Sequence, residues 1–201
     1  RRYRETSLVP ECDAAIEDIV NECITSDSAD RIVTLDLRDV KLSDSIKTKM
    51  QDEFYNILSM MKFNQNSHEI FRKWYVDGRI YFHKVVDGKR TKQGLVDIRQ
   101  VDPLKIKKVR NVETKKDPKE GVEVITKVEE FYVFNDKGFD KTGTNEGTTV
   151  RIAPEAVCYT TSGLLDFNKN AVIGYLHKAL KTANQLLSLI HISEPTRRVL
   201  I

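Results

Sequence analysis

The sequence predicts an α+β protein with N-terminal helices, a mostly antiparallel sheet and a long amphipathic helix near the C-terminus. Apolar residues recur at three- and four-residue steps before residue 78 and alternate with polar residues over much of residues 79–161. Helical spacing returns after residue 170. Helical and alternating patterns therefore occupy separate stretches of the chain, which is typical of α+β folds.

The composition is that of a soluble globular domain. The chain has 201 residues, of which 40% are hydrophobic and 31% charged, and it has no apolar run long enough to cross a bilayer. A net charge of +3 is too small to indicate nucleic-acid binding by itself. Three cysteines without a C-x-x-C pair argue against a zinc site and favour a reducing compartment. Because the chain lacks both a starting methionine and a signal-peptide core, we expect a fragment.

Two helices are expected in the first 66 residues. The first covers residues 12–24, with Pro10 in its first turn and acidic side chains opposite its apolar face. A short strand is expected at residues 33–37, where apolar and polar residues alternate. The second helix is expected to begin at Ser43, a side-chain cap. Its apolar stripe, which we expect to be buried, consists of Ile46, Met50, Phe54, Ile57, Leu58 and Met61.

The next stretch predicts a helix followed by a hairpin. Ser67 is the expected N-cap and Gly78 the expected C-terminal end of a helix. From Arg79 the period changes to two, and Asp87-Gly88 predicts a turn before a return strand at residues 95–101. A proline at position 103 ends that strand, and an extended segment follows at residues 104–112. The apolar face of the predicted helix consists of Ile70, Phe71, Trp74 and Tyr75.

The sheet is expected to continue to residue 161. Residues 122–134 predict one long or two short strands, and the polar residues 136–149 predict an exposed loop. Two short strands are expected at residues 150–152 and 157–161. A long amphipathic helix should follow, because apolar residues return at steps of four and one: Ala171, Val172, Tyr175, Leu176, Ala179, Leu180, Ala183, Leu186 and Leu187.

No catalytic, metal or cofactor site is predicted. The pentapeptide at residues 140–144, DKTGT, has the letters of the phosphorylation motif of P-type ATPases. That chemistry needs the aspartate at the end of a buried strand, a magnesium site and a membrane domain, so we interpret the pentapeptide as a loop tip. The four histidines are scattered singly, and no nucleophile motif or phosphate-binding loop occurs. We therefore expect a protein that is not an enzyme and binds no small-molecule substrate.

One local charge excess leaves two interpretations open. Residues 105–119 contain seven basic and two acidic residues, which could contact phosphates or a protein partner. The apolar residues Ile106, Val109 and Val112 equally indicate an ordinary strand with lysines on its solvated face. An alternative function is therefore a small-barrel nucleic-acid-binding module. Its candidate contact residues are Lys105, Lys107, Lys108, Arg110, Lys115 and Lys116.

Long ordered segments resemble the portal vertex protein of large contractile-tailed, myovirus-type bacteriophages. They include HEIFRKWYVDGRIYFHKVVD at residues 68–87, VDPLKIKKVR at residues 101–110, IAPEAVCYTTSGLLD at residues 152–166 and VIGYLHKALKTANQL at residues 172–186. Residues 2–24 resemble the same family. The resemblance implies a ring, usually of twelve subunits, through which DNA is packaged and ejected at one capsid vertex.

The resemblance also implies partners and a location. A homo-oligomeric ring of this kind contacts the major capsid and scaffold proteins, the terminase large subunit, later the neck proteins, and double-stranded DNA in its channel. It belongs to the virion, at the capsid vertex, after assembly in the host cytoplasm or at the inner membrane. No cofactor is implied.

Within such a subunit the chain would form part of the peripheral wing. The resemblance implies an N-terminal helical part at residues 1–66, an SH3-like sheet part at 67–165 and a long helix toward the stem at 166–188. We expect residues 189–201 to be a foreign or disordered tail, because residues 191–197 look like translated sequencing-adapter sequence. The expected subunit-contact residues on the long helix are Tyr175, Leu176, Ala179, Leu180 and Leu187.

Overall fold

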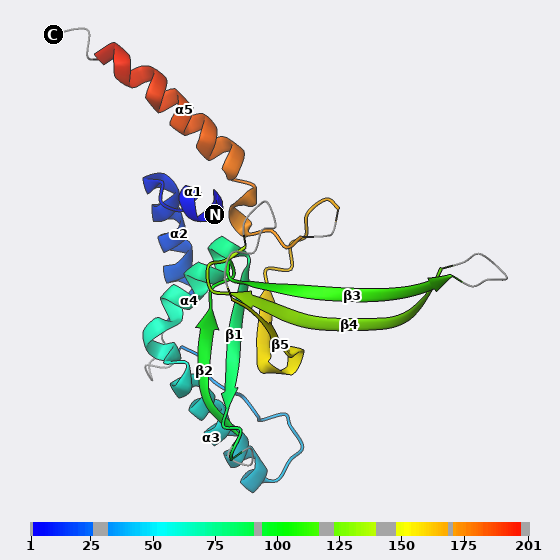
Figure 1. Ribbon diagram of the computed structural model, residues 1–201. Coiled ribbons are helices and arrows are strands. Elements are labelled where there is room, and N and C mark those ends of the chain that lie inside the picture. Colours follow the sequence, from blue (N-terminus) through cyan, green and yellow to red (C-terminus); the bar gives the residue numbers. More distant parts are fainter. Residues whose placement is uncertain are drawn as a thin grey trace. The chain divides into compact units, whose positions relative to one another are not determined.

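The computed structural model describes residues 2–25, 32–90, 94–116, 123–139, 148–168 and 171–197 (Figure 1). It divides into two compact units, of which the first combines residues 1–79 with 161–201 and the second is formed by residues 80–160. Helices dominate the first unit, and the second contains antiparallel strands. The predicted α+β class is confirmed.

The first unit is built from helices that are separated by short turns. Pro10 opens α2, where its missing N–H costs nothing, and Gly78 ends α4 in the left-handed conformation. The helical elements are α1 (Arg2–Thr6), α2 (Pro10–Cys23), α3 (Asp44–Met60), α4 (Phe63–Asp77), η3 (Tyr175–His177) and α5 (Leu180–Arg197).

The core of this unit joins three of these elements. Ile16 and Val20 of α2 pack with Val76 of α4 and Leu176 of η3, and all four side chains are buried. At its edge, the Arg4 guanidinium donates two hydrogen bonds to the Asp77 carboxylate, at 2.9 and 2.7 Å. Such a two-pronged pair fixes orientation as well as distance, so α1 is held against the end of α4.

Helix α3 corrects the sequence interpretation. None of its residues is buried, and Ile46, Met50 and Ile57 are between 37% and 47% exposed. The predicted burial of this stripe is wrong within this chain, because α3 contacts the neighbouring α4 but adds no residue to the core of the unit. The expected strand at residues 33–37 is also absent, although Leu37 is buried.

The boundary between α3 and α4 differs from the expected one. The chain turns at Lys62, whose φ of 50° is left-handed, and α4 begins at Phe63. Ser67, the expected cap, is instead buried inside α4. The polar residues 64–66 are therefore helical, because a local turn at one residue overrides their weak preference for a helix end.

The helix expected from Ala171 begins only at Leu180. Before it, the Asp166 N–H donates to the Ala171 carbonyl at 2.9 Å and the Ile173 N–H donates to the Leu164 carbonyl at 3.1 Å, so residues 164–166 lie beside residues 171–173. Gly174 then passes close to the backbone of Val76. These bonds compete with an α-helix, so Val172 precedes the helical residues and Leu176 belongs to the short 3-10 helix η3.

The second unit contains two three-stranded antiparallel sheets. The first has the order β2-β1-β6 and the second the order β3-β4-β5, so the hairpin predicted at Asp87-Gly88 is confirmed as β1 and β2. The one-strand alternative for residues 122–134 is also confirmed, as β4. The strands are β1 (Arg79–Val86), β2 (Leu95–Val101), β3 (Ile106–Lys116), β4 (Glu123–Asn135), β5 (Thr149–Ile152) and β6 (Val157–Thr161), with η2 (Pro154–Ala156) between the last two.

Both sheets contribute to one small core. Tyr81 of β1, Ile106 of β3, Tyr132 of β4 and Val157 of β6 are buried together. The Tyr81 ring stacks on the Tyr159 ring with centroids 4.7 Å apart. This core lies at the start of β3 and near the end of β4, so it fixes one end of the hairpin that those strands form.

We predict that Gly78→Ala destabilises the chain by at least about 2 kcal/mol. Gly78 has φ +71°, and a Cβ there would lie 2.6 Å from the Ile173 carbonyl oxygen and 2.7 Å from Gly174 Cα. The free energy of unfolding in urea is the measurement. Gly88→Ala is the matched control and should change it by less than about 0.5 kcal/mol, because nothing lies within 4 Å of a Cβ at that position. Equal stabilities of the two variants would contradict the close approach.

Candidate functional site

The predicted basic segment lies largely on β3, directly across from two glutamates of β4. In the antiparallel register Arg110 is opposite Glu130 and Lys108 is opposite Tyr132. The Lys108 ammonium lies 2.7 Å from one Glu130 carboxylate oxygen, and Arg110 Nε lies 3.8 Å from the other. The hydrogen bond from Lys108 holds the pKa of Glu130 below its ordinary value, and the same bond raises the pKa of Lys108.

The cations on the other face of this hairpin also have partners, which are aromatic rings and a glutamate. The Lys107 ammonium lies 4.2 Å from the centre of the Phe139 ring, and the Arg151 guanidinium lies 3.8 Å from the centre of the Phe131 ring. Lys127 and Arg151 both contact Glu129, at 2.6 and 3.3 Å. Their hydrogen bonds, that from Lys127 first, lower the pKa of Glu129.

The candidate nucleic-acid residues are therefore not brought together as a cationic surface. The described cations of β3 alternate between two faces and meet carboxylates or aromatic rings, while Lys105 is half-buried in the turn before the strand. Lys115 and Lys116 are part of β3, but their side chains lie outside the described residues. The sequence signal that was missed is the Glu129-Glu130 pair, because the strand register decides that Glu130 lies opposite Arg110 and Glu129 opposite Asn111.

The residues predicted to contact another subunit have different environments. The Tyr175 ring stacks on the Tyr75 ring, with centroids 5.0 Å apart and planes at 7°. Leu176 is buried in the core of the first unit, so its side chain is already covered within the chain. Ala179 and Leu180 are half-buried, and Leu187 lies at the exposed side of α5. Their role in subunit contact stays a prediction.

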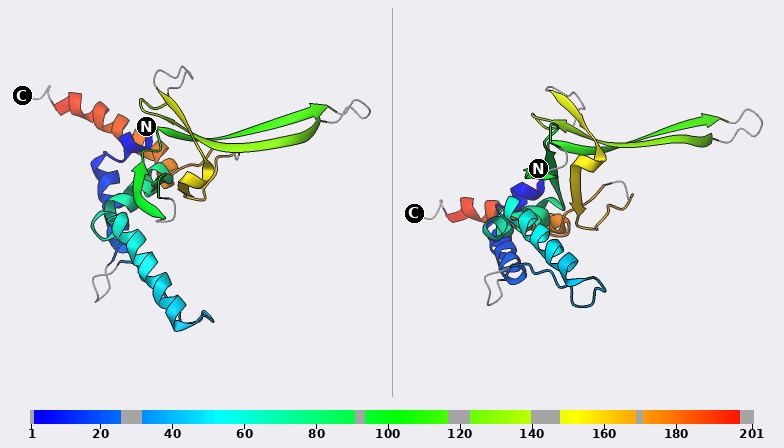
Figure 2. Two further views of the ribbon diagram at one scale, coloured as in Figure 1. Left: turned by 60° about the horizontal axis from the view of Figure 1, so that its bottom comes forward. Right: turned by 90° about the horizontal axis from the view of Figure 1, so that it is seen from below.

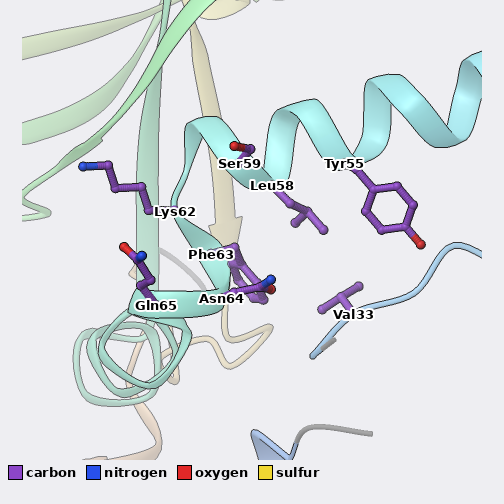
Figure 3. A pocket seen from close by; sticks show the side chains of 8 residues that line it. All are labelled: Val33, Tyr55, Leu58, Ser59, Lys62, Phe63, Asn64 and Gln65. Atoms are coloured by element: carbon purple, nitrogen blue, oxygen red, sulfur yellow. The ribbon is translucent and has the colours of Figure 1, made fainter. Parts of the chain in front are cut away.

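Described residues of the first unit line pockets at two places. One, of about 750 Å³, lies between α1 and α5 and is lined by Leu180 and Leu187 together with Arg2, Glu5, Thr6, Val9, Lys181 and Asn184. The other, of about 590 Å³, lies at the turn between α3 and α4, where Val33, Tyr55 and Leu58 gather with Phe63 and Asn64 (Figure 3). Ser59, Lys62 and Gln65 complete its lining. Sequence patterns do not predict either pocket, because each depends on how separate elements pack.

The linings of these pockets contain one carboxylate, Glu5, and neither a histidine nor a cysteine. Over the described ranges, no group of three His, Cys, Asp or Glu residues is placed to hold a metal ion. The three cysteines are free thiols. Among the described residues no helix is both long and apolar enough to span a membrane. Asp140, the aspartate of the DKTGT pentapeptide, lies outside the described residues.

The comparisons with known proteins agree on one family. A family model described as "Bacteriophage T4-like portal protein (Gp20)" matches residues 1–191. A portal protein of Vibrio phage KVP40 is 34% identical over 193 residues, covering 92% of this chain and 37% of the relative. A portal protein of Salmonella phage ViI is 29% identical over 197 residues, covering 92% of this chain and 35% of the relative. The chain thus spans about a third of the length of these curated relatives.

The contact between Lys108 and Glu130 predicts a pH response. We expect the pKa of Glu130 to lie below its ordinary value of 4.5 in the folded chain. A carboxyl group whose pKa falls on folding stabilises the fold above its unfolded-state pKa, and this contribution is lost as the pH falls through the folded-state pKa. Lys108→Gln should therefore raise the Glu130 pKa toward 4.5. Carboxyl-carbon NMR titration measures both values.

Lys137→Gln serves as the control, since it removes a cation that is not part of this pair. It should leave the Glu130 titration unchanged. An identical Glu130 titration in the wild type and in the Lys108→Gln variant would contradict the role assigned to Lys108.

Proposed function

Because the chain belongs to the family of T4-like phage portal proteins, we propose that it is part of a ring at one capsid vertex, through which the viral DNA is packaged and later ejected. The observation that carries this proposal is the family match over residues 1–191, which covers both structural units. In this proposal the chain has a structural role, and double-stranded DNA passes through the ring as cargo rather than as a substrate.

Within the subunit we assign the chain to the wing, the peripheral part of the ring. The helical unit supplies the wing's helices, and the two-sheet unit supplies its SH3-like sheet part. The capsid and scaffold proteins, the terminase large subunit and later the neck proteins are the partners of the whole subunit. Because the chain spans about a third of its relatives, the surfaces that meet these partners are shared with the remaining two thirds.

Two properties of the described residues support a role inside a larger assembly. Helix α3 leaves Ile46, Met50 and Ile57 exposed along one helix, and apolar surface of this kind usually marks a contact with another protein surface. The cations of β3 are paired with Glu130 or an aromatic ring, which favours a framework over a DNA-gripping surface. Both properties fit a wing better than the nucleic-acid-binding alternative.

The proposal predicts that the complete gene product forms rings. Negative-stain electron microscopy of that protein should show particles of cyclic symmetry with a central hole wide enough for duplex DNA. The exposed apolar residues of α3 would then be covered by protein. Compact monomers at every protein concentration tested would contradict the proposed function.

A second prediction concerns the subunit contact assigned to α5. Leu187→Glu places a charge on an exposed apolar position, so it should leave the fold intact and reduce ring assembly about tenfold or more. Circular dichroism reports the fold, and size-exclusion chromatography reports assembly. Gln185→Glu, an exposed change on the same helix, is the matched control and should assemble like the wild type. Normal assembly of the Leu187→Glu protein would contradict the assignment.

A further inference from the structure

The hairpin of β3 and β4 continues well beyond the core of its unit. Strand β5 pairs with β4 only from Tyr132 to Asn135, and no described strand pairs with the outer edge of β3. We call residues 109–114 of β3 and 127–131 of β4 the arm. Figures 1 and 2 show the arm as a two-stranded ribbon with no other strand beside it in any of the three views. Both backbone edges of the arm are therefore open among the described residues.

A two-stranded ribbon of this length needs further support. An isolated pair of strands is marginally stable in water, and natural proteins usually cover or blunt open edges. The arm has little apolar support of its own, because the facing pair Val112 and Val128 is 40% and 43% exposed. An added strand on either edge would bond the open backbone groups, which is the general mode of strand addition.

The charges of the two strands indicate which strand can be added. β3 carries Lys108 and Arg110 and, farther along the arm, Glu113. β4 carries Glu129 and Glu130 and, opposite Glu113, Lys127. Placing β4 beside β3 of a second copy in the register that the hairpin itself uses would set Glu130 beside Arg110 and Lys127 beside Glu113, which are opposite charges at both positions. Placing β4 beside β3 of the next copy gives alternating signs, with Glu130 between its own Arg110 and the cations of its neighbour.

The strand directions allow the same arrangement to repeat. β3 and β4 are antiparallel. When such hairpins are set side by side in one orientation, their successive strands alternate in direction, so β4 of one copy runs antiparallel to β3 of the next. This contact is head to tail, since it joins different surfaces of the two copies. Head-to-tail contacts form closed rings when the rotation between copies allows it.

We propose that the arm pairs edge to edge with the arm of a second copy of this chain, with β4 of one copy beside β3 of the next, so that the ring carries a continuous antiparallel sheet. This inference rests on the proposed function, because it needs copies arranged in a ring. It adds a specific interface, the two open edges of the arm, to the ring that the family membership suggests. The order of charges along β3 and β4 then favours one register of the pairing between copies.

A charge-swap variant of the complete protein tests the proposed pairing. Lys108→Glu, Arg110→Glu and Glu130→Lys together preserve opposite signs within the hairpin and between identical copies. They create like charges at every junction between a variant copy and a wild-type copy. The variant should assemble by itself. The abundance of rings that contain both kinds of copy should be lower, by about tenfold or more, than random mixing would give. Native mass spectrometry of co-expressed copies with different mass tags gives the distribution.

The matched control swaps the charges of an ion pair whose two residues are two positions apart in the sequence. Arg38 Nη2 lies 2.6 Å from an Asp36 carboxylate oxygen, and both side chains are exposed. Asp36→Arg with Arg38→Asp should mix randomly with the wild type. Random mixing by the arm variant as well would overturn the inference, and blocked mixing by both variants would also overturn it, because the effect would then not belong to the arm.

A second measurement needs no variant. In wild-type rings, the amides of residues 109–114 that point away from β4 should exchange hydrogen more slowly than solvent-exposed amides, by a factor of about ten or more. Their exchange should resemble that of the β3 amides bonded to β4. Exchange at the rate of exposed amides would overturn the inference while leaving the ring, and so the proposed function, intact. A wild-type protein that never assembles would overturn both.

Discussion

The close approach of two backbones at Gly78 and Gly174 is the constraint on which the first unit depends. A Cβ on Gly174 would lie 2.5 Å from the Val76 carbonyl oxygen, so only glycine allows this contact. Around it, the Ser162 N–H donates to the Gly78 carbonyl at 2.7 Å, and the Ser162 hydroxyl donates to the Ile173 carbonyl at 2.7 Å. These contacts place Leu176 in the core, although it is a hundred residues away from Val76 along the chain.

The same constraint explains where the sequence could and could not predict the fold. Helix α2 and the hairpin of β1 and β2 follow from local spacing and turn residues, so both could be predicted. The start of α5 could not, because the segment before Leu180 is held by distant partners that no local pattern contains. For α3 the local pattern correctly predicted a helix, but burial of its apolar face requires a partner surface that α4 only partly provides.

The candidate site was predictable to a similar extent. The lysines of β3 are visible in the sequence, and the alternation that places them on a strand is visible too. The contact of Lys108 with Glu130 is not visible, because it depends on a register that sets Glu130 opposite Arg110. A charge cluster in one segment therefore says little about surface potential until the facing strand is known. The proposed biological role comes from the family resemblance, because no constellation among the described side chains indicates it.

The aromatic cluster around Trp74 gives the first unit an internal optical reporter. Trp74 is the only tryptophan in the chain, and its ring centre lies 5.5 Å from that of Tyr175, which belongs to the segment held by Gly174. Its indole nitrogen is buried without a hydrogen-bond acceptor among the described residues. Undocking of that segment would expose the indole to water, so the emission spectrum of the unmodified protein reports directly on whether α4 and the C-terminal segment are joined.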